Sequence, residues 1–169
     1  MGLREDERID RFAAQDYPVP MSTLLEDLGG EAAMSRLAEA WHHHALADPV
    51  VNHAFSHGHR SDHTQRLAAY LTEAMGGPPR YTGHYGTESD VVRIHAGNGP
   101  HEEMDRRGLD CFDAAIRDVG LDPGSYPGDR LHALWAEGTR SFAEHSGSAD
   151  TVPDGLEIPR PAQTRDEEG

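Results

Sequence analysis

The stretch HTQRLAAYLTEAMGGPP, residues 63–79, carries the helical pattern that decides the fold class. Its inward positions recur with helical periodicity, at His63, Leu67, Tyr70, Leu71 and Ala74. That periodicity places these side chains on one face of an α-helix. Two glycines and two prolines at 76–79 cannot continue a helix, so the sequence predicts that the helix ends there.

The same periodicity continues upstream of this stretch. Ser22 is expected to cap a short first helix that stops at the double glycine of residues 29–30. Phe55 lies in the loop that precedes the helix of residues 63–74. Between the double glycine and this loop, a longer helix is predicted from three inward residues at a spacing of four: Ala33, Leu37 and Trp41.

Helical patterning also continues downstream. A polar segment at 80–89 precedes a short helix predicted over about residues 89–96. Another helix is expected to begin near Pro100, because proline suits the first helical turn, and Asp129 is expected to cap the last helix. No alternating strand pattern of useful length is present, so the predicted fold class is all-α.

Composition narrows the classes of function. The formal net charge is −15 with neutral histidine, which argues against nucleic acid and against anionic membrane surfaces as partners. No apolar run is long enough to span a membrane, and the charged N-terminus does not resemble a secretory signal. Cys111 is the only cysteine, so a reducing cytoplasm is the expected setting.

The two ends of the chain differ from its middle. Residues 1–20 are charged and finish in an extended Tyr-Pro-Val-Pro sequence, so they are interpreted as an N-terminal extension. Residues 147–169 are rich in Ser, Asp, Pro and Glu and have few apolar groups, which predicts a flexible acidic tail. One folded domain is therefore expected over residues 21–146.

The twelve histidines invite a search for metal sites, since histidine is the commonest metal ligand. His63 and His95 both fall at inward positions of different predicted helices and could enclose a flat iron cofactor. His42 borders the apolar face of its helix. A zinc site is a weaker reading of the second cluster, which has no cysteine and no standard ligand spacing: His53, His57, His59 and His63.

Three motifs resemble a known family. LLEDLGG at 24–30, LAAYLTEAMGGP at 67–78 and the later pair His95-Ala96 are similar to the helix ends and proximal histidine of truncated haemoglobins. Tyr81, an aromatic residue after the second double glycine, belongs to the same pattern. The resemblance covers about residues 21–146 and favours the group II subfamily. It implies a two-over-two helical sandwich around haem b.

The resemblance also implies roles for individual residues. His95 would be the axial ligand of the haem iron, and His63 would face a ligand bound on the other side. Phe55 would pack on the haem edge and Leu67 would touch the haem face. Three more residues would contact or surround the cofactor, with Arg93 a weaker candidate than Tyr81 to approach a propionate: Tyr70, Tyr81 and Arg93.

This sequence departs from the group II pattern on the distal side. His42 stands where a tyrosine is common, and His63 stands where many members have a small residue. Gly108 stands where a tryptophan is common. A glycine inside a helix costs about 1 kcal/mol relative to alanine, so Gly108 indicates either close contact between helices or an enlarged space above the haem.

Three functions follow from these features. The first is a haem globin that binds O2, NO or CO opposite His95. The second is a haem enzyme of peroxidase, oxygenase or nitrogen-oxide type, which would bind a small organic substrate in the enlarged pocket. In such an enzyme His63 or His42 would act as acid–base, and a reductase would be a plausible partner. The third is a non-haem histidine-cluster metal protein. The sequence leaves open whether the protein is an enzyme.

Overall fold

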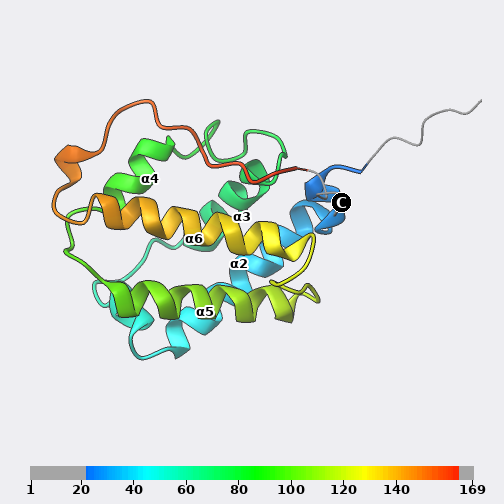
Figure 1. The fold of residues 1–169 in the computed structure, drawn as a ribbon, viewed down its shortest axis with the longest axis horizontal. Coiled ribbons are helices and arrows are strands. Elements are labelled where there is room, and N and C mark those ends of the chain that lie inside the picture. The colour runs from blue at the N-terminus through cyan, green and yellow to red at the C-terminus, as the bar shows by residue number, and fades with distance from the viewer. Residues whose placement is uncertain (1–21, 164–169) are drawn as a thin grey trace, which may run out of the picture.

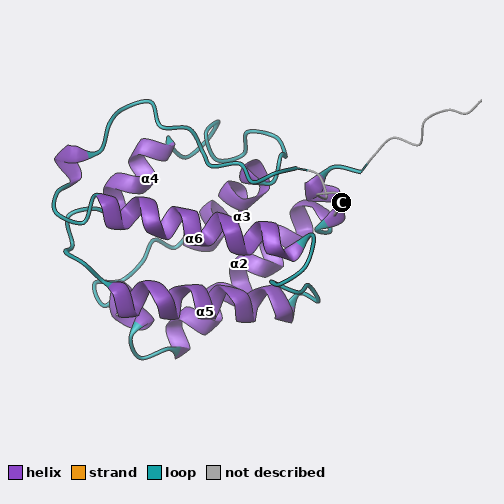
Figure 2. Cartoon of the chain, in the orientation of Figure 1, coloured by secondary structure: helices purple, strands orange, loops and turns teal. Residues whose placement is uncertain are grey.

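The computed structural model describes residues 22–163, and within that range the chain forms helices and no strands (Figures 1 and 2). This confirms the all-α prediction. The N-terminal extension expected at 1–20 lies outside the described residues. The helices run in the order α1 Leu24–Asp27, α2 Gly30–Ala47, η1 Val51–Phe55, α3 His63–Ala74, α4 Glu88–His95, α5 Glu102–Asp118, α6 Gly128–Glu144 and η2 Ala149–Thr151.

Local sequence explains where these helices begin. Thr23, rather than the expected Ser22, caps α1, because its hydroxyl accepts a hydrogen bond from the Glu26 backbone while the Glu26 carboxylate accepts one from the Thr23 backbone. Gly29 adopts a left-handed conformation with φ of 99°, which lets α2 follow at once. The α6 helix begins at Gly128, one residue before the cap expected at Asp129.

Two helix pairs form the body of the domain. The α2 helix packs against α3, α5 packs against α6, and α2 also contacts α5, so one pair lies over the other. Figure 1 shows α5 and α6 as neighbours running across the front of the molecule. The core between the pairs is apolar and holds these fully buried side chains: Met34, Leu37, Leu71, Phe112, Ile116 and Leu131. The structure confirms the sandwich implied by the resemblance.

A partly buried ion pair fixes the turn after α2. The guanidinium of Arg107 on α5 donates to both carboxylate oxygens of Asp48, with Nη2 2.6 Å from Oδ2. Asp48 Oδ1 also accepts hydrogen bonds from the backbone of Val50 and Val51. These donors hold the pKa of Asp48 below its usual range. The pair therefore ties the beginning of η1, which carries Phe55, to α5.

The segment after α6 differs from the flexible tail expected from its composition. Residues 145–163 fold back across α4, and two of their few apolar side chains, Val152 and Ile158, are 5% and 7% exposed. Val152 packs against Val92 and Ala96 of α4. Average composition missed this contact because single apolar residues, rather than a continuous apolar run, attach the segment.

Candidate functional site

The α4 helix ends on the histidine that the sequence singled out. Thr87 and Asp90 form a capping box at the start of α4, so the helix begins at a defined residue and reaches His95 after two turns. His95 Nδ1 lies 2.8 Å from the carbonyl oxygen of Val91. A carbonyl only accepts hydrogen bonds, so Nδ1 carries the proton and donates it. The lone pair of Nε2 is then free for a metal.

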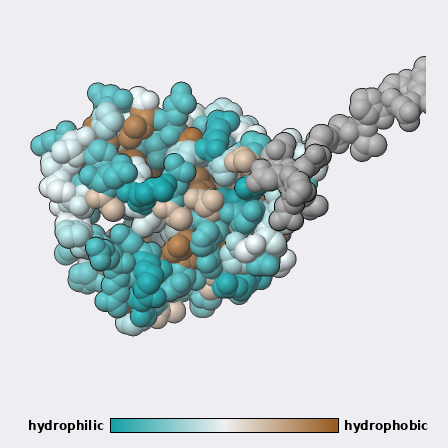
Figure 3. All heavy atoms as spheres, viewed as in Figure 1, coloured by the Kyte–Doolittle hydropathy of each residue, from teal (hydrophilic) through white to brown (hydrophobic). Residues whose placement is uncertain are grey.

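His95 is surrounded by protein on several sides, yet its side chain is open to solvent. Its ring stacks on that of Phe142 from α6, with centroids 4.1 Å apart and an angle of 6° between the planes. Burial among the surrounding helices lowers the pKa of His95, yet solvent still reaches the side chain. A His95 ring that is surrounded by protein and still accessible to solvent indicates a concave site. Figure 3 shows the surface hollowed between the end of α6 and the beginning of α5.

A cluster of rings forms another part of this interior. His63 at the start of α3, His42 on α2, and Phe55 of η1 lie with ring centroids 5.5 Å apart in each pairing. His59 joins them from the loop, 4.6 Å from His42. Trp41 stacks against His63 at 6.0 Å. Residues from α2, η1 and α3 that are far apart in sequence are thus brought together, as expected for His42, Phe55 and His63.

The two inner histidines of this cluster are uncharged at neutral pH. Burial lowers the pKa of His63 to about 4, and the positive charges of His42, His59 and His95 act in the same direction. Burial, followed by the charge of His59, lowers the pKa of His42. His95 therefore lies close enough for its charge to act on His63. The Nδ1 atoms of His42 and His63 are buried without a hydrogen-bond partner.

The structure decides between the two interpretations of Gly108. This glycine is buried within α5, but a Cβ atom built on it would meet no atom within 4 Å outside its own helix backbone. Close contact between helices is therefore wrong, and the interior beside Gly108 is open. Glycine at position 108 therefore leaves more space along α5 than a large side chain would leave.

A buried carboxyl group is the residue that sequence reasoning missed. Glu88 is 3% exposed, and burial raises its pKa to about 7, with a hydrogen bond from Tyr70 as the opposing influence. Burial and the negative charge of Glu88 raise the pKa of Tyr70. No sequence pattern indicates this pair, because an acidic residue in the first turn of a helix is ordinarily a solvated partner of the helix dipole.

Tyr81 and Arg93 have protein partners. The Tyr81 ring packs edge-on against Tyr70 at 5.5 Å and is 7% exposed. The guanidinium of Arg93 pairs with Asp90 and Asp154 and is directed to the C-terminal segment. A haem propionate, which Arg93 was expected to approach, would therefore compete with these two carboxylates for the guanidinium. Leu67 is partly buried and packs against the main core.

The histidines do not form a conventional metal centre. Among residues 22–163, no group of three or more His, Cys, Asp or Glu side chains is placed to hold a metal ion. No helix in the described part of the chain is long and apolar enough to cross a membrane.

Comparison with known proteins decides the family. The model of the bacterial-like globin family matches residues 23–127. The chain belongs to the bacterial-like globin family. Group 1 truncated haemoglobin GlbN of Synechocystis sp. is 32% identical over 101 residues, covering 59% of this globin and 73% of the relative. A group 1 truncated haemoglobin of Tetrahymena thermophila is 34% identical over 99 residues, 59% of this globin and 78% of the relative.

Solved structures agree on the fold. The group II truncated haemoglobin of Bacillus anthracis superposes with a TM-score of 0.62 at 19% identity, over 72% of this globin and 91% of that chain. A thermostable haemoglobin of Thermobifida fusca gives 0.61 at 24% identity, over 72% and 97%. The truncated haemoglobin resemblance is confirmed. The two relatives above are group 1 proteins, whereas the Bacillus anthracis structure is a group II protein, and at 19% identity that structure shows the fold alone.

The residues of this globin fit haem, the cofactor of its family. One imidazole, His95, has its Nδ1 occupied by the Val91 carbonyl, which leaves Nε2 free, and its side chain is open to solvent. Two further imidazoles, His42 and His63, present unpartnered buried nitrogen atoms, and a side chain at Gly108 would meet open space. A flat iron-containing group requires this combination of one ligand, apolar rings and room.

Proposed function

We propose that this globin holds haem b through His95 and binds O2 or another diatomic gas on the side that His63 faces. One observation carries the proposal: the His95 side chain lies in an open cleft with Nδ1 donating to Val91 at 2.8 Å. That hydrogen bond fixes the tautomer and increases the electron density available at Nε2. The haem iron, when bound, supplies the position at which a gas molecule coordinates.

Apolar and aromatic side chains would hold the macrocycle. Phe142 supports the His95 ring from α6, while Phe55 and Leu67 are partly buried side chains of η1 and α3. Trp135 stacks on buried Phe112 at 4.2 Å and keeps α5 and α6 together. Such apolar contacts would keep water from the haem, with His95 of α4 as its iron ligand.

His63 is the group best suited to hydrogen-bond a bound gas molecule. Its low pKa keeps it neutral at pH 7, so one ring nitrogen carries a proton and the other accepts. Its Nδ1 has no protein partner. Donation from His63 to the partly negative dioxygen would stabilise the bound state. His42 has the same unpartnered atom and is the second donor.

The rate of O2 release tests this distal role. In the haem-loaded ferrous protein, His63→Leu removes one hydrogen bond of about 1–1.5 kcal/mol, so O2 dissociation should accelerate about tenfold. His57→Leu, at an exposed histidine of the same loop, serves as the control and should leave the rate unchanged. Equal rates for the wild type, His63→Leu and His42→Leu would contradict the proposal.

The open space beside Gly108 favours a second candidate, a haem enzyme that oxidises a small organic molecule. The same neutral His63 could accept and return a proton during such chemistry. Binding of phenolic molecules should then change the haem absorbance of the wild type, and Gly108→Leu should abolish that change. A wild-type spectrum that phenols leave unaltered would exclude this candidate without affecting gas binding.

A further inference from the structure

The helix that carries His95 depends on the end of the chain for its packing. The α4 helix contacts η2 and the end of α6 more extensively than it contacts any other described helix. Residues 145–163, which we term the C-terminal strap, cross over α4 and lie beyond the region that matches the family model. The support of α4 is therefore a property of this chain's own C-terminal sequence.

A buried serine joins α4 to the middle of the strap. Ser89 is 1% exposed, and its hydroxyl donates to the carbonyl oxygen of Pro153 at 2.8 Å. The Ser89 Oγ atom in turn accepts a hydrogen bond from the backbone N–H of Leu156 at 3.1 Å. One side chain thus pairs with two backbone groups of the strap, a donor and an acceptor.

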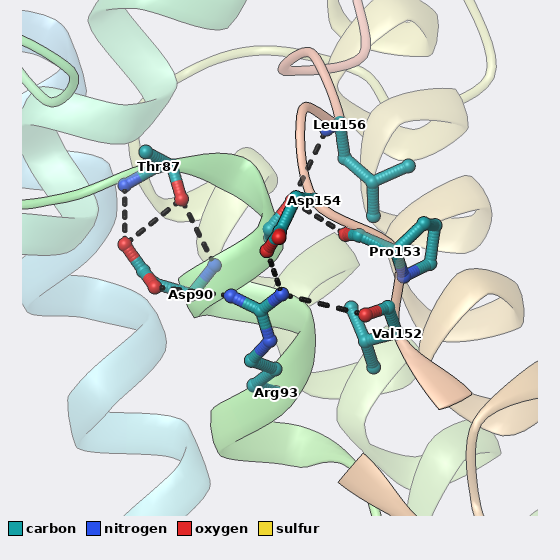
Figure 4. Close-up of polar contacts among 8 residues, drawn as sticks. Thr87, Asp90, Arg93, Val152, Pro153, Asp154 and Leu156 are labelled. Carbon is teal, nitrogen blue, oxygen red and sulfur yellow. Dashed lines mark hydrogen bonds and ion pairs between the residues drawn. The ribbon is translucent and has the colours of Figure 1, made fainter. Parts of the chain in front are cut away.

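A charged group of α4 makes a second attachment. Arg93 Nη2 donates to the Asp154 carboxylate and lies 3.4 Å from the carbonyl oxygen of Val152. Arg93 Nη1 lies 3.5 Å from Asp90, one turn earlier on α4. Figure 4 shows the guanidinium between the helix and the strap, with the capping pair Thr87 and Asp90 to its left. The strap is thus attached on both sides of Val92.

Apolar contacts fill the space between these polar attachments. Val92, Ala96 and Val152 form a small buried cluster separate from the main core, and Phe142 and Leu156 pack against it. Val92 is fully buried. Phe142 also stacks on His95, so the cluster that the strap completes is continuous with the ring that orients the histidine.

Both ends of the strap are fixed. At its beginning, the backbone N–H groups of Gly97 and Gly99 donate to the carbonyl oxygens of His145 and Ser146, at 3.1 and 2.8 Å. At its other end, Ile158 is buried in the main core. A segment anchored at two ends and bonded in the middle restricts the position of the helix beneath it.

We propose that the C-terminal strap positions α4, so that Ser89 and Arg93 act as positioning residues that determine how His95 is presented to the haem iron. The inference rests on the proposed role of His95 as iron ligand. Displacement of α4 would turn the imidazole or lengthen its bond to iron, while the rest of the globin remained folded.

Two measurements on the haem-loaded protein test this inference. Hydrogen exchange of the α4 amides reports the helix, and the iron–histidine stretching band of the ferrous haem reports His95. Truncation after Gly147 and the single change Ser89→Ala should each accelerate α4 exchange, Ser89→Ala by about tenfold because two buried hydrogen bonds are lost. The stretching band should shift or broaden, and exchange in α2 and α5 should not change.

Matched variants separate positioning from general stability. Asp154→Ala should produce a smaller effect, about two- to fivefold, because the Asp154 side chain is exposed. Asp154→Glu should restore wild-type behaviour, and Glu157→Gln, at an exposed strap residue, should show wild-type behaviour. Should the truncated chain not fold, Ser89→Ala and Asp154→Ala still decide the question.

Two results would overturn the inference. One is an unchanged α4 exchange rate and an unchanged band in Ser89→Ala and the truncated protein. The other is equal acceleration in every helix, since the strap would then act on global stability alone. Failure of the proposed function would give a different result. If His95 were not the iron ligand, the full-length wild type would either lack an iron–histidine stretching band or keep the same band in His95→Gly.

Discussion

The His95 and Phe142 rings lie almost parallel, with 6° between their planes and 4.1 Å between their centroids. Phe142 comes from α6 and His95 from the last residue of α4, so the contact joins the two helices at the cleft. The hydrogen bond to Val91 restricts the same imidazole from within α4. Two contacts from two helices therefore determine the direction in which Nε2 points.

Removal of the Phe142 ring should weaken haem retention without removing the iron ligand. Aromatic pairs contribute about 0.5–1.5 kcal/mol beyond the area that they bury, so Phe142→Leu should accelerate haem transfer to an acceptor globin by about two- to tenfold. Phe142→Tyr keeps the ring and is the matched control. If Phe142→Leu releases haem at the wild-type rate, the stack does not orient His95.

The low pKa of His63 predicts a stability that depends on pH in the haem-free protein. The unfolded chain binds more protons than the folded chain between about pH 6.5 and pH 4, so stability falls as the pH falls through this window. The full effect is about 2–3 kcal/mol after allowance for partial exposure. His63→Gln should flatten the pH dependence of urea unfolding, whereas His57→Gln should not. Parallel curves for all three proteins would contradict this account.

Glu88 predicts the opposite dependence at higher pH. Its pKa is raised to about 7 by burial, so the folded chain binds more protons than the unfolded chain between about pH 4.5 and pH 7. Stability from this group is complete below pH 4.5 and is lost as the pH rises through 7, by about 3 kcal/mol. Glu88→Gln should remove this loss, so the variant should gain stability over the wild type from pH 5 to pH 8. If Glu88→Gln and the wild type differ in stability by the same amount at pH 5 and at pH 8, Glu88 does not titrate in this range.

Much of the fold could be predicted because it depends on local signals. Helical periodicity and double glycines located α2, α3 and the following turn, and the structure keeps these boundaries within a few residues. The inward positions of His63 and His95 followed from the same periodicity. The motifs around residues 24–30 and 67–78 then supplied the family.

Long-range contacts account for what the sequence did not reveal. Arg93 was expected near a propionate, but a carboxylate 61 positions later along the chain, Asp154, pairs with it. Ser89 bonds to Pro153 across a separation of 64 residues. Glu88 is buried because the strap and Tyr70 surround it, which no pattern within α4 indicates. A polar segment attached at a few single residues has the same composition as a mobile tail.

Gly108 offers a direct probe of the open space beside it. Gly108→Ala adds a methyl group that meets no neighbour and improves helix propensity, so it should raise the free energy of unfolding by up to about 1 kcal/mol. Gly108→Trp should fill the space and slow gas entry, measured by CO rebinding after flash photolysis. Destabilisation by Gly108→Ala would mean that the interior at this position is packed, contrary to the structure.

The role of His95 is the central claim, and the absorbance spectrum of the protein reconstituted with haemin tests it most directly. The wild type and the control variant His57→Ala should show one sharp Soret band. His95→Gly should lose or shift that band, and added imidazole, which can occupy the space of the missing side chain, should restore it. A His95→Gly protein with the wild-type spectrum, unaffected by imidazole, would contradict the account.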